Sequence, residues 1–186
     1  PLIPLFRAAI DAASDDHVRL ALCVARAGLV SHGLSLAHTH TRLNAAQLHN
    51  VVRQRLGIAD PPEDPAHRRA LFSKINTALD NVQPIPVDFG ALLAEQASAA
   101  RLMMTVAQIV KHVDGSVPIR FLIAETETGY TLRSALWLAK LFGVDRFVGI
   151  SPLFETADAL EHGATALAEA LRSPHYRAYL QATAKL

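Results

Sequence analysis

Three short apolar segments, each followed by a segment with helical spacing, constrain the fold of this chain more than any other feature. Residues 119–124 and 146–151 are apolar runs of the length that buried strands have. The remaining segment, residues 34–42, comes first along the chain and alternates between larger and smaller side chains. A strand there would place one set of residues on one face: Leu34, Leu36, His38, His40 and Arg42. Strands that alternate with helices form parallel sheets covered by crossover helices. We therefore expect a helix-rich α/β fold.

The remaining sequence is mostly helical in pattern, and seven helices are expected over residues 18–31, 45–56, 65–79, 89–112, 131–142, 158–171 and 173–186. Asn44 is a suitable cap for the second of these, and Gly57 ends it. Segment 89–112 is expected to be one long helix, because it has no proline and is rich in Ala, Leu, Met and Val.

The number of strands limits the architecture. A closed (β/α)8 TIM-type barrel typically needs about 250 residues, whereas this chain has 186 residues and three visible units. Residues 1–186 are therefore either a single domain with a small open sheet and additional helices, or a fragment of a larger barrel.

Composition excludes several classes of protein. The formal charge is +1 and no cluster of basic residues stands out, so neither nucleic acid nor a membrane surface is an expected partner. No apolar run approaches the roughly 20 residues that cross a bilayer. Cys23 is the single cysteine and lies in an apolar helical pattern, which predicts a buried thiol and no disulfide. We expect a cytoplasmic protein.

Two residues are candidates for a functional site. Glu155 follows the strand-like run 146–151 and precedes a helix, and Arg42 lies near the carboxyl end of the first predicted strand. The carboxyl ends of parallel strands are where α/β folds place ligands and catalytic groups. Each residue also has a structural interpretation, since Glu155 could cap the following helix and Arg42 could pair with an acidic neighbour.

The histidines and two further acids are less informative. His38 and His40 share a strand face, but no third metal ligand is evident from spacing, so buried and hydrogen-bonded imidazoles are expected there. Glu125 and Glu127 could line the same strand-end region as Glu155 or stabilise a helix start. The other histidines without a motif are expected to be surface or capping residues, namely His49, His112, His162 and His175.

Several segments together resemble phosphoenolpyruvate carboxylase. Segment 151–160 reads Ser-Pro-Leu-Phe-Glu-Thr-Ala-Asp-Ala-Leu and is similar to the P-L-F-E-T segment of that family, and segment 173–180 is similar to the helix that follows it. Segments 41–44 and 56–58 resemble the family's R-Q-E-S motif and the L-G-I that follows. The resemblance covers residues 34–186 in one consistent order.

The resemblance implies a TIM-type barrel enzyme that converts phosphoenolpyruvate and bicarbonate to oxaloacetate and phosphate, a carbon dioxide fixation step. Glu155 matches the glutamate that binds the essential Mg²⁺ or Mn²⁺, a hard cation that prefers oxygen ligands. Arg42 matches the arginine of R-Q-E-S, whose guanidinium suits a phosphate or carboxylate. The family also implies a homo-oligomer, specifically a tetramer.

The chain departs from the family pattern. Arg42 is followed by Leu-Asn-Ala rather than Gln-Glu-Ser, and neither the H-P-T-E segment with the catalytic histidine nor the G-Y-S-D-S segment with the second metal carboxylate occurs in residues 1–186. We therefore expect the isolated chain to be inactive. The alternative is a non-catalytic helical interaction domain derived from the same family. A barrel fragment would also expose strand edges, which favour self-association.

Overall fold

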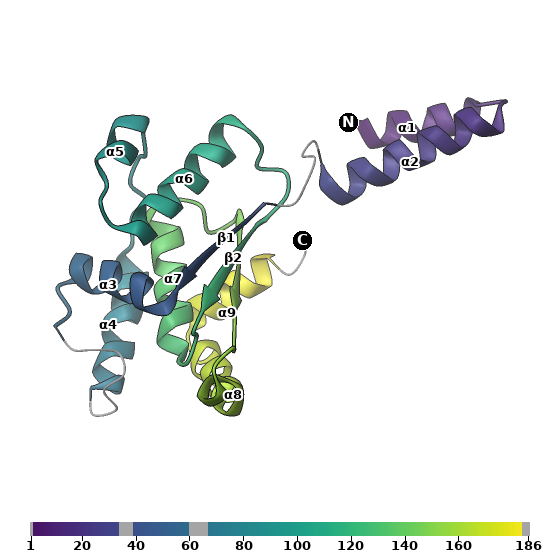
Figure 1. Ribbon diagram of the computed structural model, residues 1–186. Coiled ribbons are helices and arrows are strands. Elements are labelled where there is room, and N and C mark those ends of the chain that lie inside the picture. The colour runs from purple at the N-terminus through teal and green to yellow at the C-terminus, as the bar shows by residue number, and fades with distance from the viewer. Residues whose placement is uncertain (1, 34–38, 60–66, 184–186) are drawn as a thin grey trace. The chain divides into compact units, whose positions relative to one another are not determined.

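The computed structural model describes residues 2–33, 39–59 and 67–183 and divides the chain into two compact units, 1–38 and 39–186. The first unit consists of helices α1 (Leu2–Ala12) and α2 (Asp16–His32), which pack side by side as a hairpin (Figure 1). The Asp15 side chain caps α2 by accepting the backbone N–H groups of His17 and Val18. Helix α2 was predicted within two residues at each end, and α1 was not predicted.

The prediction of a buried Cys23 was wrong, because its side chain is exposed. Helix α2 carries apolar residues on all sides, but only one side packs against α1. Leu20 and Val24 are accordingly 63% and 64% exposed, and neither helix contains a buried residue. An apolar pattern leads to burial only where a partner covers it. Across the described ranges of the chain, no helix combines the length and apolar character that crossing a membrane requires.

The second unit is built on a parallel sheet with the order β1-β2-β3, formed by β1 (His40–Asn44), β2 (Ile119–Ala124) and β3 (Val148–Pro152). The helices of this unit are α3 (Ala45–Leu56), α4 (Arg68–Asn81), α5 (Phe89–Ala94), α6 (Ser98–His112), α7 (Gly129–Leu141), α8 (Ala157–Leu171) and α9 (Pro174–Thr183). The predicted helix-rich α/β fold with a parallel sheet is confirmed. The predictions for residues 34–38, for Pro65 and for residues 184–186 lie outside the described ranges.

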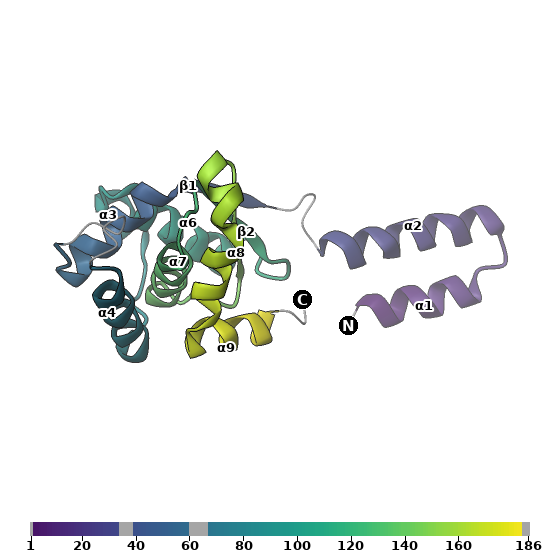
Figure 2. The same ribbon diagram turned by 90° about the horizontal axis from the view of Figure 1, so that it is seen from below.

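The two faces of the sheet differ. One face is buried by the helices, with α7 running along it (Figures 1 and 2), and Phe121 and Ile123 on this face are fully buried. The opposite face carries exposed Arg42 on β1 and exposed Arg120 on β2, with half-buried Leu122 between them. Arg120 lies across β3, because a Cβ atom placed on Gly149 would be 3.4 Å from its Nη1. The second face is therefore polar and open among the described residues.

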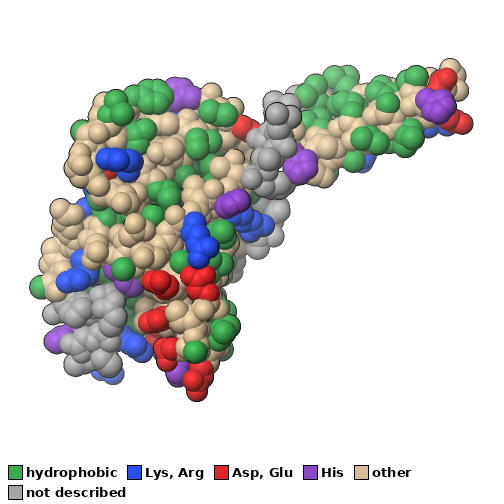
Figure 3. All heavy atoms as spheres, in the orientation of Figure 1, with side chains coloured by type: hydrophobic (Ala, Val, Ile, Leu, Met, Phe, Trp, Pro, Cys, Tyr) green, Lys and Arg blue, Asp and Glu red, His purple; other side chains and the backbone are tan. Residues whose placement is uncertain are grey.

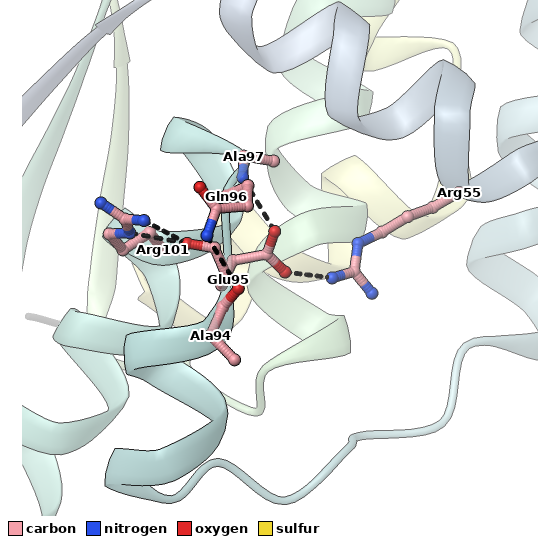
Figure 4. A network of polar contacts seen from close by, with 6 residues as sticks. All are labelled: Arg55, Ala94, Glu95, Gln96, Ala97 and Arg101. Carbon is pink, nitrogen blue, oxygen red and sulfur yellow. Dashed lines mark hydrogen bonds and ion pairs between the residues drawn. The ribbon is translucent and has the colours of Figure 1, made fainter.

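The predicted long helix 89–112 is instead two helices, and the connection between α5 and α6 is held by Glu95 (Figure 4). The Glu95 carboxylate accepts the Ala97 N–H at 2.9 Å and pairs with Arg55 of α3 at 2.8 Å. The Arg101 guanidinium donates to the Glu95 carbonyl through Nε at 2.8 Å. These bonds hold Glu95 in an extended conformation. Helix propensity predicted continuity, but half-buried polar contacts with α3 outweigh it.

Candidate functional site

Arg42 and Glu155, the two residues singled out in the sequence, are in direct contact although 113 positions separate them. The Arg42 Nη2 atom donates to both carboxylate oxygens of Glu155, at 3.1 Å to Oε1 and 2.9 Å to Oε2. Both side chains are accessible, with 57% of the Arg42 side chain and 38% of the Glu155 side chain exposed. The fold thus brings a cation and a carboxylate together near the carboxyl ends of the strands.

Local structure explains how the chain presents these groups. Arg42 lies within β1, opposite Leu122 of β2, and two residues before Asn44 ends the strand. Glu155 lies in the loop between β3 and α8, and the cap of α8 is Thr156, whose hydroxyl accepts the Ala159 N–H at 3.1 Å. The interpretation of Glu155 as a helix cap is therefore wrong. The interpretation of Arg42 as the partner of an acidic neighbour is confirmed, and the neighbour is Glu155 itself.

A polar pocket of about 480 Å³ lies among the helices that follow the strands. Its lining residues come from α3, α4, α7, α8 and the loop after β2: Ala45, Ala46, His49, Arg68, Glu125, Glu127, Thr128, Thr131, Asp158, His162, Thr165 and Glu169. Figure 3 shows acidic side chains gathered toward the lower end of the visible face, in the direction of α8 in Figure 1. Neither Arg42 nor Glu155 lines this pocket. The strand-end region therefore contains two separate polar features, the ion pair of Arg42 and Glu155 and the pocket.

His49 is buried at the wall of this pocket, which corrects the prediction of a surface or capping residue. Its Nε2 atom lies 2.9 Å from the Thr131 Oγ1 atom. Burial, with a smaller effect from the nearby Arg53 charge, lowers the pKa of His49 to about 4, so the ring is neutral at pH 7. The spacing Ala45, Leu48, His49, Val52 places His49 in the buried stripe of α3, and this signal was present in the sequence.

Glu169 is a buried carboxylate of α8 that sequence reasoning missed. Its Oε2 atom accepts the Gly129 N–H at 3.0 Å, at the start of α7, and its Oε1 atom lies 3.5 Å from the Arg68 Nη1 atom. Arg133 donates to the backbone carbonyl of Glu169 and stacks over the Phe72 ring at 4.4 Å. A carboxylate at a helix N-terminus is stabilised by the free N–H groups there. Glu169 therefore joins α8 to the start of α7.

The two acids after β2 take part in the pocket and not in the contact between Arg42 and Glu155. Glu125 and Glu127 are exposed and line the pocket. Glu125 has a φ of 57°, which places a residue other than glycine in the left-handed region. Such a conformation costs on the order of 1–3 kcal/mol, and conformations of this kind cluster at functional sites. The backbone therefore turns at Glu125, directly after β2 and at the wall of the pocket.

The described residues do not complete a metal site. No group of three or more His, Cys, Asp and Glu side chains in the described ranges could hold a metal ion. Glu155 offers one carboxylate, already bonded to Arg42. His40 is exposed, which overturns its expected burial, and His38 lies outside the described residues. A divalent cation would need further oxygen ligands beside Glu155.

Comparisons of the chain with protein-family models, with curated proteins and with solved structures gave no match.

Proposed function

We propose that this chain is part of the catalytic barrel of a phosphoenolpyruvate carboxylase, a carboxy-lyase that acts in the cytoplasm. The supporting observation is the contact between Arg42 and Glu155. Two motifs of the sequence, far apart along the chain, each supplied one of these residues as a site residue, and their side chains lie 2.9 Å apart. Residues that serve one active site must meet in space, and this requirement is met.

The open face of the sheet supports a barrel larger than the three visible strands. Sheets made only of parallel strands almost always have both faces covered. Here one face is covered by helices, while Arg42 and Arg120 stand exposed on the other. In a (β/α)8 barrel the helices lie outside and the remaining strands enclose the second face. Additional strands from the same barrel would cover this face of the sheet.

In this proposal Arg42 binds the phosphate of phosphoenolpyruvate, because its planar guanidinium can donate two parallel hydrogen bonds and stays charged. Glu155 contributes one ligand to a Mg²⁺ or Mn²⁺ ion, a cation that stabilises negative charge on substrate oxygens. The second carboxylate has to come from outside residues 1–186. The isolated chain is therefore expected to lack carboxylase activity with phosphoenolpyruvate and bicarbonate.

The test uses the longer protein that contains this segment. Glu155→Gln keeps the size of the side chain but removes its charge, and we expect oxaloacetate formation at a fixed Mg²⁺ concentration to fall at least a hundredfold. The matched control is Glu161→Gln, which neutralises an exposed carboxylate on α8 and should leave activity near wild type. Unchanged metal dependence in Glu155→Gln would remove this residue from the site. Robust turnover by residues 1–186 alone would overturn the expected inactivity.

The hairpin of α1 and α2 favours a second function, that of a helical interaction domain. None of the residues of α1 and α2 is buried, and Leu5, Leu20 and Val24 are each more than 60% exposed. Apolar surface of this kind is typical of surfaces that bind another protein chain, here a second copy in a homo-oligomer. The double substitution of Leu20 and Val24 by glutamate should lower the oligomer mass measured by light scattering. An unchanged mass would exclude the hairpin from the interface.

A further inference from the structure

The two outer edges of the sheet are not equivalent. In a parallel pair every second residue of a strand bonds to its neighbour, and the residues between them direct their backbone groups outward. The Leu153 N–H donates to the Ile123 carbonyl, and the Ile119 N–H donates to the Phe147 carbonyl, so Phe147 and Leu153 bond toward β2. The alternating residues Val148 and Ile150 therefore direct their backbone groups to the outer edge of β3. Unpaired groups on such an edge can accept a strand from another chain.

Tyr179 of α9 occupies this edge of β3. The Ile150 N–H donates to the Tyr179 hydroxyl oxygen at 2.8 Å, and the same hydroxyl donates to the Val148 carbonyl at 2.8 Å. One hydroxyl group thus satisfies a donor and an acceptor that an adjacent strand would otherwise bond. Tyr179 is 6% exposed, so water has little access to the backbone groups that the hydroxyl bonds.

Two further features keep the edge closed. Pro152 is the next residue whose backbone faces outward, and proline has no N–H to offer an incoming strand. Helix α9 is anchored by a second buried tyrosine, Tyr176, whose ring centroid lies 5.7 Å from that of Tyr179. Burial raises the pKa of Tyr179, so its hydroxyl keeps the proton that it donates to Val148.

In the part of the chain that the structure describes, the outer edge of β1 has no comparable cover. Arg120 N–H donates to the Thr39 carbonyl, which places Thr39 and Thr41 toward β2 and the backbone of Arg42 toward the outside. The Arg42 side chain is itself exposed. Among the described residues, no side chain bridges backbone groups of β1 as Tyr179 bridges those of β3.

We propose that Tyr179 is an edge plug, a side chain that occupies the backbone hydrogen-bonding groups of β3 and prevents a second copy of this chain from pairing its own β3 there. The sheet can then be extended beside β1 but not beside β3 while α9 stays in place. The expectation that strand edges favour self-association is thereby restricted to β1. In the proposed barrel, a strand added next to β3 would first have to displace Tyr179.

Amide hydrogen exchange measured by NMR on the complete chain tests the plug directly. In the wild-type chain, the Ile150 amide on the β3 edge should be protected at least tenfold more than the Arg42 amide on the β1 edge. Tyr179→Phe removes the hydroxyl and keeps the ring, so the protection of Ile150 should fall at least tenfold. The matched control is Tyr176→Phe, because the Tyr176 side chain is buried on the same helix but does not bond to β3. It should leave Ile150 protected within about a factor of two.

Sedimentation of the same variants measures the consequence for association. Tyr179→Phe should self-associate at a concentration at least tenfold lower than the wild type or Tyr176→Phe. The proposal is overturned if Ile150 in the wild type is no better protected than Arg42. It is also overturned if Tyr179→Phe matches the wild type in either exchange or association. The comparison within the wild type decides the question even if a variant fails to fold. None of these measurements depends on carboxylase activity, so a failure of the plug can be distinguished from a failure of the proposed function.

Discussion

The pair formed by Arg42 and Glu155 and the pair formed by Glu169 and Gly129 both join a strand-end segment to a distant part of the chain, but their surroundings are opposite. The Glu155 side chain is 38% exposed, whereas the Glu169 side chain is 10% exposed and accepts a backbone N–H at 3.0 Å. Exposed ion pairs contribute little to stability, and buried carboxylates must be bonded to be tolerated. The exposed pair is therefore available for binding, while the buried contact fixes the packing of α7 on α8.

The largest expected change in unfolding free energy is at the buried contact between Gly129 and Glu169. A Cβ atom on Gly129 would lie 2.5 Å from the backbone N of Ala170 and 2.8 Å from the carbonyl oxygen of Ala166. Backbone atoms cannot move aside locally, so Gly129→Ala should push α7 and α8 apart. Overpacking typically costs 1–3 kcal/mol, and this contact should reach at least about 3 kcal/mol of unfolding free energy, measured by urea denaturation.

Gly28→Ala is the matched control, because a Cβ atom at Gly28 would meet nothing within 4 Å. This substitution lies inside α2, where alanine is favoured over glycine by up to about 1 kcal/mol. It should leave the unfolding transition of residues 39–186 unchanged. A fully stable Gly129→Ala variant would show that the two helices separate at little cost, and the contrast with the exposed pair would then be wrong.

The buried residue His49 predicts that the stability of the chain depends on pH. His49 has a pKa of about 4 in the folded chain and an ordinary pKa of about 6.5 when unfolded. Below about pH 6.5 the unfolded chain binds a proton that the folded chain does not, so stability is complete above that pH and decreases as the pH falls toward 4. We expect a loss of about 2 kcal/mol between about pH 7 and pH 5, measured as the urea midpoint at each pH.

His49→Gln should reduce this loss, because glutamine does not titrate and can still bond to Thr131. The exposed His162 lines the same pocket, and His162→Gln is the control that should retain the wild-type pH dependence. A pH dependence that is the same in the wild type and in His49→Gln would mean that His49 is not the group responsible.

Continuous and local patterns in the sequence predicted the α/β class and several individual elements closely. The apolar run at 119–124 became β2 with the same bounds, and the expected helix at 158–171 became α8 with one added residue. The prediction that Asn44 caps α3 is also confirmed, since its side chain accepts the Gln47 N–H at the start of that helix. These features depend on neighbours within a few residues, which the sequence displays directly. Arg42 and Glu155 were identified by motif, and their contact could not be inferred from spacing.

Features that depend on distant partners were not predictable in the same way. The break at Glu95 requires Arg55 from another helix, and the exposure of Cys23 follows from a face of α2 that α1 does not cover. The role of Glu169 depends on the absence of a side chain at Gly129, 40 positions earlier. Local propensity predicted the helical conformation of α2 and α8 correctly and missed the break at Glu95, and in all three cases it carried no information on distant contacts.

The smallest effect is expected at the exposed pair. Arg42→Gln and Glu155→Gln should each change the unfolding free energy of the chain by less than about 1 kcal/mol, because solvent weakens an ion pair with exposed side chains and both groups regain water when the pair is broken. A double-mutant cycle on the urea midpoints would measure their coupling, with about 0.5 kcal/mol as the expected value. A coupling above about 2 kcal/mol would mean that the pair is a structural contact like that of Glu169. A small coupling would mean that the ion pair can break at little cost to the stability of the fold. Arg42 could then bind a phosphate and Glu155 a cation, as proposed.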